Sequence, residues 1–225
     1  MIGTIANTSA VLAGSLVGIV AGKRIGADLK ETLMKALGLA VVVIGLQMAL
    51  TAKGLIAAVA CLLLGALTGE LMRIERGVER VGEFLKVRFN SSSATFVQGF
   101  MSATLLYITG AMVIVGCIQD GTAHNPDTLY LKSMLDGVSS IALASTLGIG
   151  VAFSALSVLV VQGSLTLVAS HIAFLQEPSV LSSITITGGM IIMGIGINLL
   201  GLTTIRVGNL IPALVYAAVY PLIFS

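Results

Sequence analysis

The N-terminal stretch MIGTIANTSAVLAGSLVGIVAGKR, residues 1–24, decides the class of fold. Residues 1–21 contain no basic residue, and about 20 predominantly apolar residues are what one helix needs to cross a bilayer. Lys23 and Arg24 follow directly, whereas a cleaved secretory signal carries its positive charges before the apolar core. The stretch therefore predicts a retained membrane-spanning helix. Because Lys and Arg are enriched in cytoplasmic loops, its N-terminus is expected outside the cell.

The composition of the whole chain extends this prediction. Hydrophobic residues make up 56% of the 225 positions, charged residues make up 10%, and mean hydropathy is +1.06. A soluble domain carries about a quarter charged residues. No polar stretch is long enough to fold separately, so residues 1–225 are predicted to form one integral membrane domain, an all-α polytopic bundle of transmembrane helices. The net charge of +2 gives no sign of nucleic-acid binding.

About eight segments have the length and composition of a crossing. They are residues 2–21, 32–50, 55–69, 96–118, 133–150, 151–172, 181–202 and 209–224. Residues 133–172 contain no polar loop and could form two crossings, or one crossing plus a re-entrant segment. With two crossings there, every Lys and Arg falls inside except Lys53 and Lys132, which is the bias expected of a bacterial inner-membrane protein.

Residues 70–89 are the long charged stretch of the sequence. Apolar residues recur there at alternating steps of three and four, at Leu71, Ile74, Val78, Val81 and Leu85. That spacing predicts an amphipathic helix. Its basic residues suit a helix that lies on the cytoplasmic leaflet with the apolar stripe in lipid, as a linker over about residues 70–95.

The first three predicted spans resemble the last three at a nearly constant spacing. The matching motifs are Gly14-Ser15-Leu16 with Gly163-Ser164-Leu165, Gly38 and Gly45 before Leu46-Gln47 with Gly189 and Gly196 before Ile197-Asn198, and Leu55-Ile56 with Leu210-Ile211. In the predicted topology each span of the first set runs opposite to its counterpart. Residues 2–69 and 151–224 are therefore predicted to form an inverted repeat around central helices at 96–150, which is the plan of many secondary transporters.

Glycines recur every fourth residue in two of the spans, at Gly14, Gly18 and Gly22 and again at Gly65 and Gly69. Small faces of this kind let helices approach closely. Packing within one chain and packing between two copies both explain them, so a homo-oligomer stays open.

Four long stretches of the sequence resemble a known family. They are the opening MIGTIANTSAVLAGSLVGIVAGKRI, GAMVIVGCIQDG at 110–121, KSMLDGVSSIALASTLGIGVAFSAL at 132–156 and GIGINLLGLTTIRVGNLIPAL at 194–214. Through them the chain resembles, essentially end to end, the bacterial membrane proteins collected as domain of unknown function 554, the YqgA/YdfK group. The resemblance implies a multi-spanning inner-membrane protein of a kind often labelled a transport protein. It implies no catalytic or binding residues.

Polar side chains inside apolar spans are the candidate functional residues, because they are costly in lipid. The candidates for a substrate path are Asp136, Gln162, Gln47, Asn198, Asn7, Gln98, Ser145 and Thr146. Their predicted depths run from the outer half for Asn7, Gln47 and Asp136, through the middle for Gln162, to the inner half for Gln98 and Asn198. Each amide could equally tie two helices together by a hydrogen bond worth about 0.6–2 kcal/mol.

Asp136 is the sharpest candidate. It lies four residues after Lys132 near the external end of its span, where a surface ion pair would explain it. The basic residue comes first, however, which is the less favourable order on a helix, and Gly137 would let a backbone or a ligand come close. No basic residue is predicted deep in a span, so a cation is favoured over an anion as a charged substrate.

No enzymatic motif is visible in the sequence: it has no nucleophile elbow, phosphate loop or metal-ligand spacing. Cys61 and Cys117 lie inside apolar runs, where buried free thiols are expected. We therefore predict a transporter or channel for a small solute or cation, without enzymatic activity or a cofactor, that works by alternating access between the repeats. The alternative is a non-transporting membrane scaffold or regulatory subunit, with residues 70–89 as the partner surface.

Overall fold

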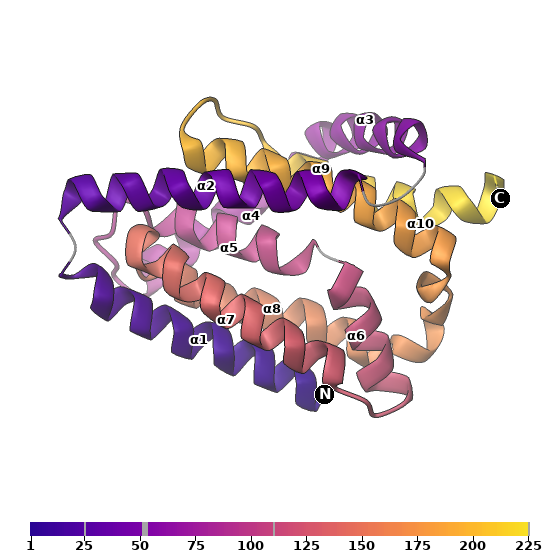
Figure 1. Cartoon of the computed structure of the whole chain (residues 1–225), viewed down its shortest axis with the longest axis horizontal. Coiled ribbons are helices and arrows are strands. Elements are labelled where there is room, and N and C mark those ends of the chain that lie inside the picture. Colours follow the sequence, from indigo (N-terminus) through magenta and orange to yellow (C-terminus); the bar gives the residue numbers. More distant parts are fainter. Residues whose placement is uncertain (25, 51–53, 110, 225) are drawn as a thin grey trace.

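The computed structural model of the protein describes residues 1–24, 26–50, 54–109 and 111–224. All regular structure among these residues is helical (Figure 1). The α-helices are α1 (Ile2–Gly22), α2 (Ala27–Leu50), α3 (Leu55–Met72), α4 (Ile74–Arg88), α5 (Phe96–Ile108), α6 (Ala111–Thr122), α7 (Asp127–Leu147), α8 (Gly150–Leu167), α9 (Pro178–Leu200) and α10 (Pro212–Phe224). Short 3₁₀ turns lie at Ala169–His171, Ala173–Gln176 and Val207–Leu210. Lys53, one of the two basic residues predicted outside, lies outside the described residues.

Most of the predicted spans are recognisable in these helices. In the part of the chain that the structure describes, α1, α2, α3, α8, α9 and residues 207–224 are each long and apolar enough to cross a membrane. α5 and α6 together form one further candidate. The prediction of an all-α polytopic membrane bundle is confirmed. α7, the remaining predicted crossing, falls outside this set because Lys132 and Asp136 interrupt its apolar sequence.

The predicted span 96–118 is not one helix. The axes of residues 96–108 and 112–122 meet at 63°, so this region is a broken span or a re-entrant loop (Figure 1). At the end of α5 both the amide and the hydroxyl of Thr109 donate to the carbonyl oxygen of Leu105, which closes the last turn. The apolar run continues through the break without a charged residue. Counting apolar residues therefore could not reveal it.

Residues 133–172 are divided into two helices by a tight turn. Gly148, directly after α7, has φ +78°, a conformation that favours glycine. A Cβ on Gly150 at the start of α8 would collide with the carbonyl oxygen of Phe96. The Gly-Ile-Gly motif is thus a sharp connection between α7 and α8. α8 ends at Leu167, so the span predicted to reach residue 172 was too long.

α1 and α7 run parallel with their backbones in contact. A Cβ on Gly14, Gly18 or Gly22 would collide with backbone oxygens of α7, and the contacted residues advance in step from Gly137 through Ile141 to Ser145 (Figure 1). The glycines at every fourth position therefore pack inside this chain. Gly65 and Gly69 do the same against residues 213 and 209.

Each helix of the first predicted repeat packs against its predicted counterpart, in the pairs α1 with α8, α2 with α9 and α3 with α10. α2 and α9 run antiparallel, because Gly38 contacts Gly196 while Gly45 contacts Gly189. The predicted repeat makes Gly38 equivalent to Gly189 and Gly45 equivalent to Gly196. Under this equivalence the contact between Gly38 and Gly196 corresponds to the contact between Gly189 and Gly45. That is the pattern a two-fold axis between α2 and α9 would give. The two-fold axis itself stays a prediction, to be tested by superposing residues 2–69 on 151–224 in an experimental structure.

α4 is the amphipathic helix predicted within residues 70–89, but its apolar stripe is not all in lipid. Ile74, Val78 and Leu85 are half-buried, and Gly82 packs against the ring of Phe100 on α5. The stripe therefore docks α4 onto the bundle. This corrects the prediction that the stripe faces lipid. The spacing of apolar residues could not reveal that α5 lies beneath the stripe.

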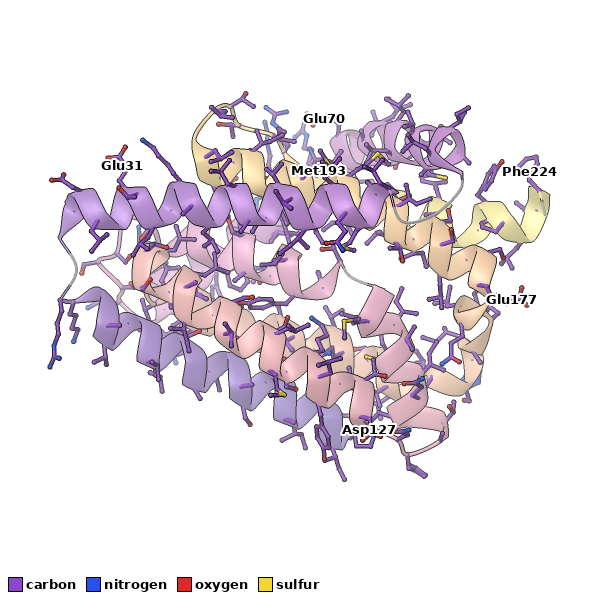
Figure 2. The ribbon with its side chains drawn as sticks, viewed as in Figure 1. Glu31, Glu70, Asp127, Glu177, Met193 and Phe224 are labelled. Carbon is purple, nitrogen blue, oxygen red and sulfur yellow. The ribbon has the colours of Figure 1, made fainter. Side chains whose placement is uncertain are left out.

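Charged and apolar side chains are unevenly distributed over the surface. Figure 2 shows Glu31 toward the left end of the long axis and Glu177 toward the right, the side on which the C-terminus lies in Figure 1. Between these ends, exposed Leu, Ile and Val side chains cover the outer faces of α1, α2, α3 and α7. This is the distribution expected of helices that face lipid.

Candidate functional site

Three of the predicted path residues meet between α1, α7 and α8. The Asn7 side-chain nitrogen Nδ2 donates to Asp136 Oδ2 at 2.9 Å and to Gln162 Oε1 at 3.0 Å. Asn7 and Gln162 are both 0% exposed, and they lie 155 positions apart in the sequence. We call Asn7, Asp136 and Gln162, together with Lys132, the amide–ion cluster.

Lys132 completes the cluster and corrects one expectation. Its Nζ lies 2.6 Å from Asp136 Oδ2, and the two side chains are only 7% and 10% exposed. The prediction placed Lys132 in an external loop and no basic group deep in a span. α7 instead begins at Asp127, so Lys132 lies inside the helix one turn before Asp136 and on the same face. The ion pair is buried, so a basic group lies beside Asp136 inside the bundle, and the argument that favoured a cation over an anion loses its support.

The hydrogen bonds of the cluster fix how its two amides are oriented. Turning the Asn7 amide would set its oxygen against the Asp136 carboxylate, and turning the Gln162 amide would set two NH₂ groups against each other. With the amides in these orientations, Asn7 Oδ1 and Gln162 Nε2 are buried without a hydrogen-bond partner among the described residues. Unpaired buried polar atoms are rare in folded proteins and call for an explanation.

Further polar groups extend the cluster in both directions. Toward α5, the Tyr107 hydroxyl lies 2.7 Å from Ser140 Oγ, and Lys132 Nζ is 6.0 Å from the centre of the Tyr107 ring. Toward the N-terminal end, the hydroxyls of Thr4 and Thr166 lie 3.3 Å apart. The polar contacts therefore run along one face each of α1, α7 and α8.

Asp120 connects the broken helix pair to the start of α1. Its Oδ2 accepts from the backbone N–H of Gly3 at 3.1 Å and lies 2.8 Å from the amino group of Met1. A carboxylate at a helix N-terminus pairs with otherwise free N–H groups and with the positive end of the helix dipole. α6 is thereby held against the same end of α1 that carries Asn7.

Sequence reasoning missed Tyr107, Thr4, Thr166 and Asp120 as members of this region, and it considered the Lys132–Asp136 pair only as a surface ion pair. A signal for some of them was available: Lys132, Asp136 and Ser140 follow one another at steps of four, and Thr4 precedes Asn7 by three. Those steps put the residues of each helix on one face. Nothing in the sequence told which helices would bring these faces together.

Gln98 and Asn198 line a separate cavity of about 410 Å³. It lies between α4, α5, α9 and the segment 203–207, and Glu75 and Glu79 of α4 also line it. Asn198 is used structurally, because its amide donates to and accepts from the backbone of Ile205 at 2.7 Å in each case. The two residues were both predicted in the inner half, and the structure brings them to one cavity.

The remaining candidates lie elsewhere. Ser145 and Thr146 line a cavity of about 240 Å³ near the end of α7, and their hydroxyls donate to backbone carbonyls of their own helix. Gln47 is exposed on α2. None of these three contributes to the amide–ion cluster.

A second polar network connects the N-terminal end of α4 to the rest of the bundle. Asn209 accepts from the backbone N–H of Glu75 at 2.7 Å and donates to Glu70 at 2.6 Å, and Arg206 pairs with Glu70 at 2.5 Å. Burial raises the pKa of the Glu75 carboxyl above its ordinary value, while a hydrogen bond from the N–H of Gly208 acts in the opposite direction. This network positions α4 beside the 410 Å³ cavity.

Within the described ranges, no group of three His, Cys, Asp or Glu side chains is placed to hold a metal ion. Cys61 and Cys117 are buried and free, as predicted. The amide–ion cluster is thus built from two amides and one ion pair.

The apolar helices and the buried cluster together define a polytopic α-helical membrane protein. The chain belongs to the family described as Protein of unknown function (DUF554), whose model matches residues 2–222. It is 33% identical over 219 residues to the uncharacterized membrane protein YdfK of Bacillus subtilis, covering 95% of this chain and 93% of that one. It is 29% identical over 222 residues to the uncharacterized protein YqgA of Escherichia coli, covering 96% and 94%. No solved structure matches. The predicted family is confirmed.

Proposed function

We propose that the protein transports a small solute across the bacterial inner membrane, with its N-terminus outside, and that the amide–ion cluster is its central binding site. The observation that carries the proposal is the pair of unpaired polar atoms, Asn7 Oδ1 and Gln162 Nε2, buried beside an ion pair inside the bundle. Ionisable and polar groups at such positions are expensive and mark substrate or ion pathways by default.

A purely structural role explains the cluster less well. Amides that only join helices stabilise the fold most when each of their buried polar atoms has a hydrogen-bond partner, because a buried atom without one destabilises the fold by about 1–3 kcal/mol. The cluster leaves one acceptor and one donor unpaired at full burial. A ligand that bonds to both would remove this cost, which supports binding over helix joining alone.

The surroundings supply the other parts of a transport path. The break between α5 and α6 lies just after Tyr107, which contacts the cluster through Ser140. Broken helices beside a buried site are common in transporters built from inverted repeats. The 410 Å³ cavity that holds Gln98 and Asn198 is suited to be an entrance from the side predicted as cytoplasmic.

A flux screen in proteoliposomes tests the proposal. Purified protein is compared with empty vesicles for uptake of small solutes and ions, and Asp136→Asn and Gln162→Leu are each expected to abolish the flux found. Asp127→Asn is the matched control, because it makes the same change in an exposed carboxylate on the same helix. If Asp136→Asn and Gln162→Leu both fold and transport normally, the cluster is not the site.

A further inference from the structure

The amide–ion cluster carries one charge of each sign and therefore no net charge. Asp136 is paired with Lys132 at 2.6 Å, and Asn7 and Gln162 are neutral amides. We infer that the ligand of this site is a small zwitterion of the α-amino acid class, with an ammonium group and a carboxylate; this deepens the proposed function and rests on it.

Charge balance argues against a bare ion. The Asp136 carboxylate is already neutralised by Lys132, so a metal cation or an organic cation would leave the buried site with a net positive charge. A bare anion would leave it net negative. An uncompensated charge in the membrane interior is strongly unfavourable. A zwitterion brings both signs and leaves the balance unchanged.

The unpaired atoms of the cluster match the two ends of a zwitterion. Both hydrogen bonds of the Asp136 carboxylate end on Oδ2, which leaves its Oδ1 without a partner among the described residues. Asp136 Oδ1 and Asn7 Oδ1 are acceptors for an ammonium group. Gln162 Nε2, and the Lys132 ammonium, whose one hydrogen bond to a described residue goes to Asp136, are donors for a carboxylate.

The ion pair would be exchanged rather than simply broken. The ammonium group of the ligand pairs with the Asp136 carboxylate in place of Lys132. The carboxylate of the ligand then pairs with the Lys132 ammonium group. Every charge has an opposite partner before and after binding, so the resting protein is stable without ligand. Lys132 acts in the empty site as a substitute for the ligand's own ammonium group.

Close packing at the cluster limits the ligand to a small one. Asn7 and Gln162 are both 0% exposed. A Cβ placed on Gly163, beside Gln162, would meet Met1 Cε at 3.7 Å, which is an ordinary van der Waals contact.

The test is a thermal-shift measurement on the purified full-length protein in detergent. Each of the proteinogenic amino acids is the probe, and methylammonium, acetate, an equimolar mixture of the two, acetamide and sodium are the comparisons. Methylammonium and acetate together carry the charged groups of glycine on separate molecules. We expect at least one small amino acid to raise Tm in a saturable way while all the comparisons leave it unchanged.

Variants locate the binding. Asp136→Asn and the double variant Lys132→Met with Asp136→Asn are expected to weaken binding on the order of 100-fold or to abolish it. The double variant keeps the site neutral, so its folding, checked by size exclusion, separates lost binding from lost structure. Asp127→Asn is expected to bind as the parent does.

Three results would overturn the inference: no amino acid shifts Tm, sodium or methylammonium shifts it as strongly as any amino acid, or the folded double variant keeps the full shift. The flux screen distinguishes this inference from transport itself. Cation flux that depends on Asp136, without an amino-acid shift, overturns the zwitterion and leaves transport standing. Amino-acid binding without any flux overturns transport and leaves the ligand class standing.

Discussion

Removing one member of the Lys132–Asp136 pair is expected to destabilise the protein far more than removing both. The Nζ to Oδ2 distance is 2.6 Å and both side chains are at most 10% exposed, so Lys132→Met or Asp136→Asn leaves the other group buried without its partner. Breaking a buried pair in this way costs about 3–5 kcal/mol. Replacing both charges is expected to cost about 1 kcal/mol or less, because neutral residues need no charge partner.

The exposed pair Lys35–Glu31 on α2 is the control. It has the same spacing in sequence and the same 2.6 Å distance, but its side chains are 58% and 67% exposed. A surface pair of this kind is worth about 0.3–0.5 kcal/mol. The two pairs share their spacing and distance, and they differ in burial, in the order of the charges along the helix and in the acidic residue.

Double-mutant cycles on both pairs measure the difference. The free energy of unfolding is taken from reversible denaturation by SDS in mixed micelles, followed by circular dichroism, for the parent, each single variant and each double variant. The cost of the two single variants together exceeds that of the double variant, so we expect a coupling energy of about 5 kcal/mol or more for the buried pair and about 0.5 kcal/mol or less for the exposed pair. Equal coupling energies would show that the Lys132–Asp136 pair is solvated, and the charge argument for the cluster would fail.

Three further predictions concern packing, topology and pH. Gly69→Ala is expected to destabilise by about 1–3 kcal/mol, because a Cβ there collides with backbone of the facing segment, while Gly163→Ala, which has room, is expected to be tolerated in the same unfolding assay. A cysteine at Asp127 should react with a membrane-impermeant maleimide on intact spheroplasts and one at Arg80 should not; labelling at Arg80 alone would invert the proposed orientation. Burial raises the pKa of Glu75, so its contribution to stability is present below the unfolded pKa of about 4.5 and is lost as pH rises through the higher folded pKa. Glu75→Gln should reduce this dependence of Tm on pH, and an unchanged profile would assign the dependence to other groups.

Membrane class and most helices could be predicted from sequence because each depends on local composition. The run before Lys23 is apolar for the length of one crossing, and α1 indeed spans Ile2–Gly22. The break after α5 could not be predicted in this way, since its flanking residues are as apolar as those of a continuous span.

The candidate site was predictable only in part, for a related reason. Asn7, Asp136 and Gln162 were each predicted because a polar side chain is costly in lipid, and in the structure the three side chains are joined by hydrogen bonds. The Lys132–Asp136 pair was considered only as a surface pair, because a basic residue was taken to mark the end of a span. A charge inside a span becomes acceptable when its partner lies one turn away, and whether that pair faces protein or water depends on tertiary packing.

The glycine contacts between α1 and α7 also determine which parts of the bundle can separate. Backbones that touch at Gly14, Gly18 and Gly22 interlock, which favours movement of the two helices as one body. Asn7 and Asp136 both lie on this body. Gln162 lies on α8, which follows the turn at Gly148 and is bonded to α1 from Gln162 to Asn7 and from Thr166 to Thr4. Moving α8 away from this body would open the cluster and would break both of those bonds.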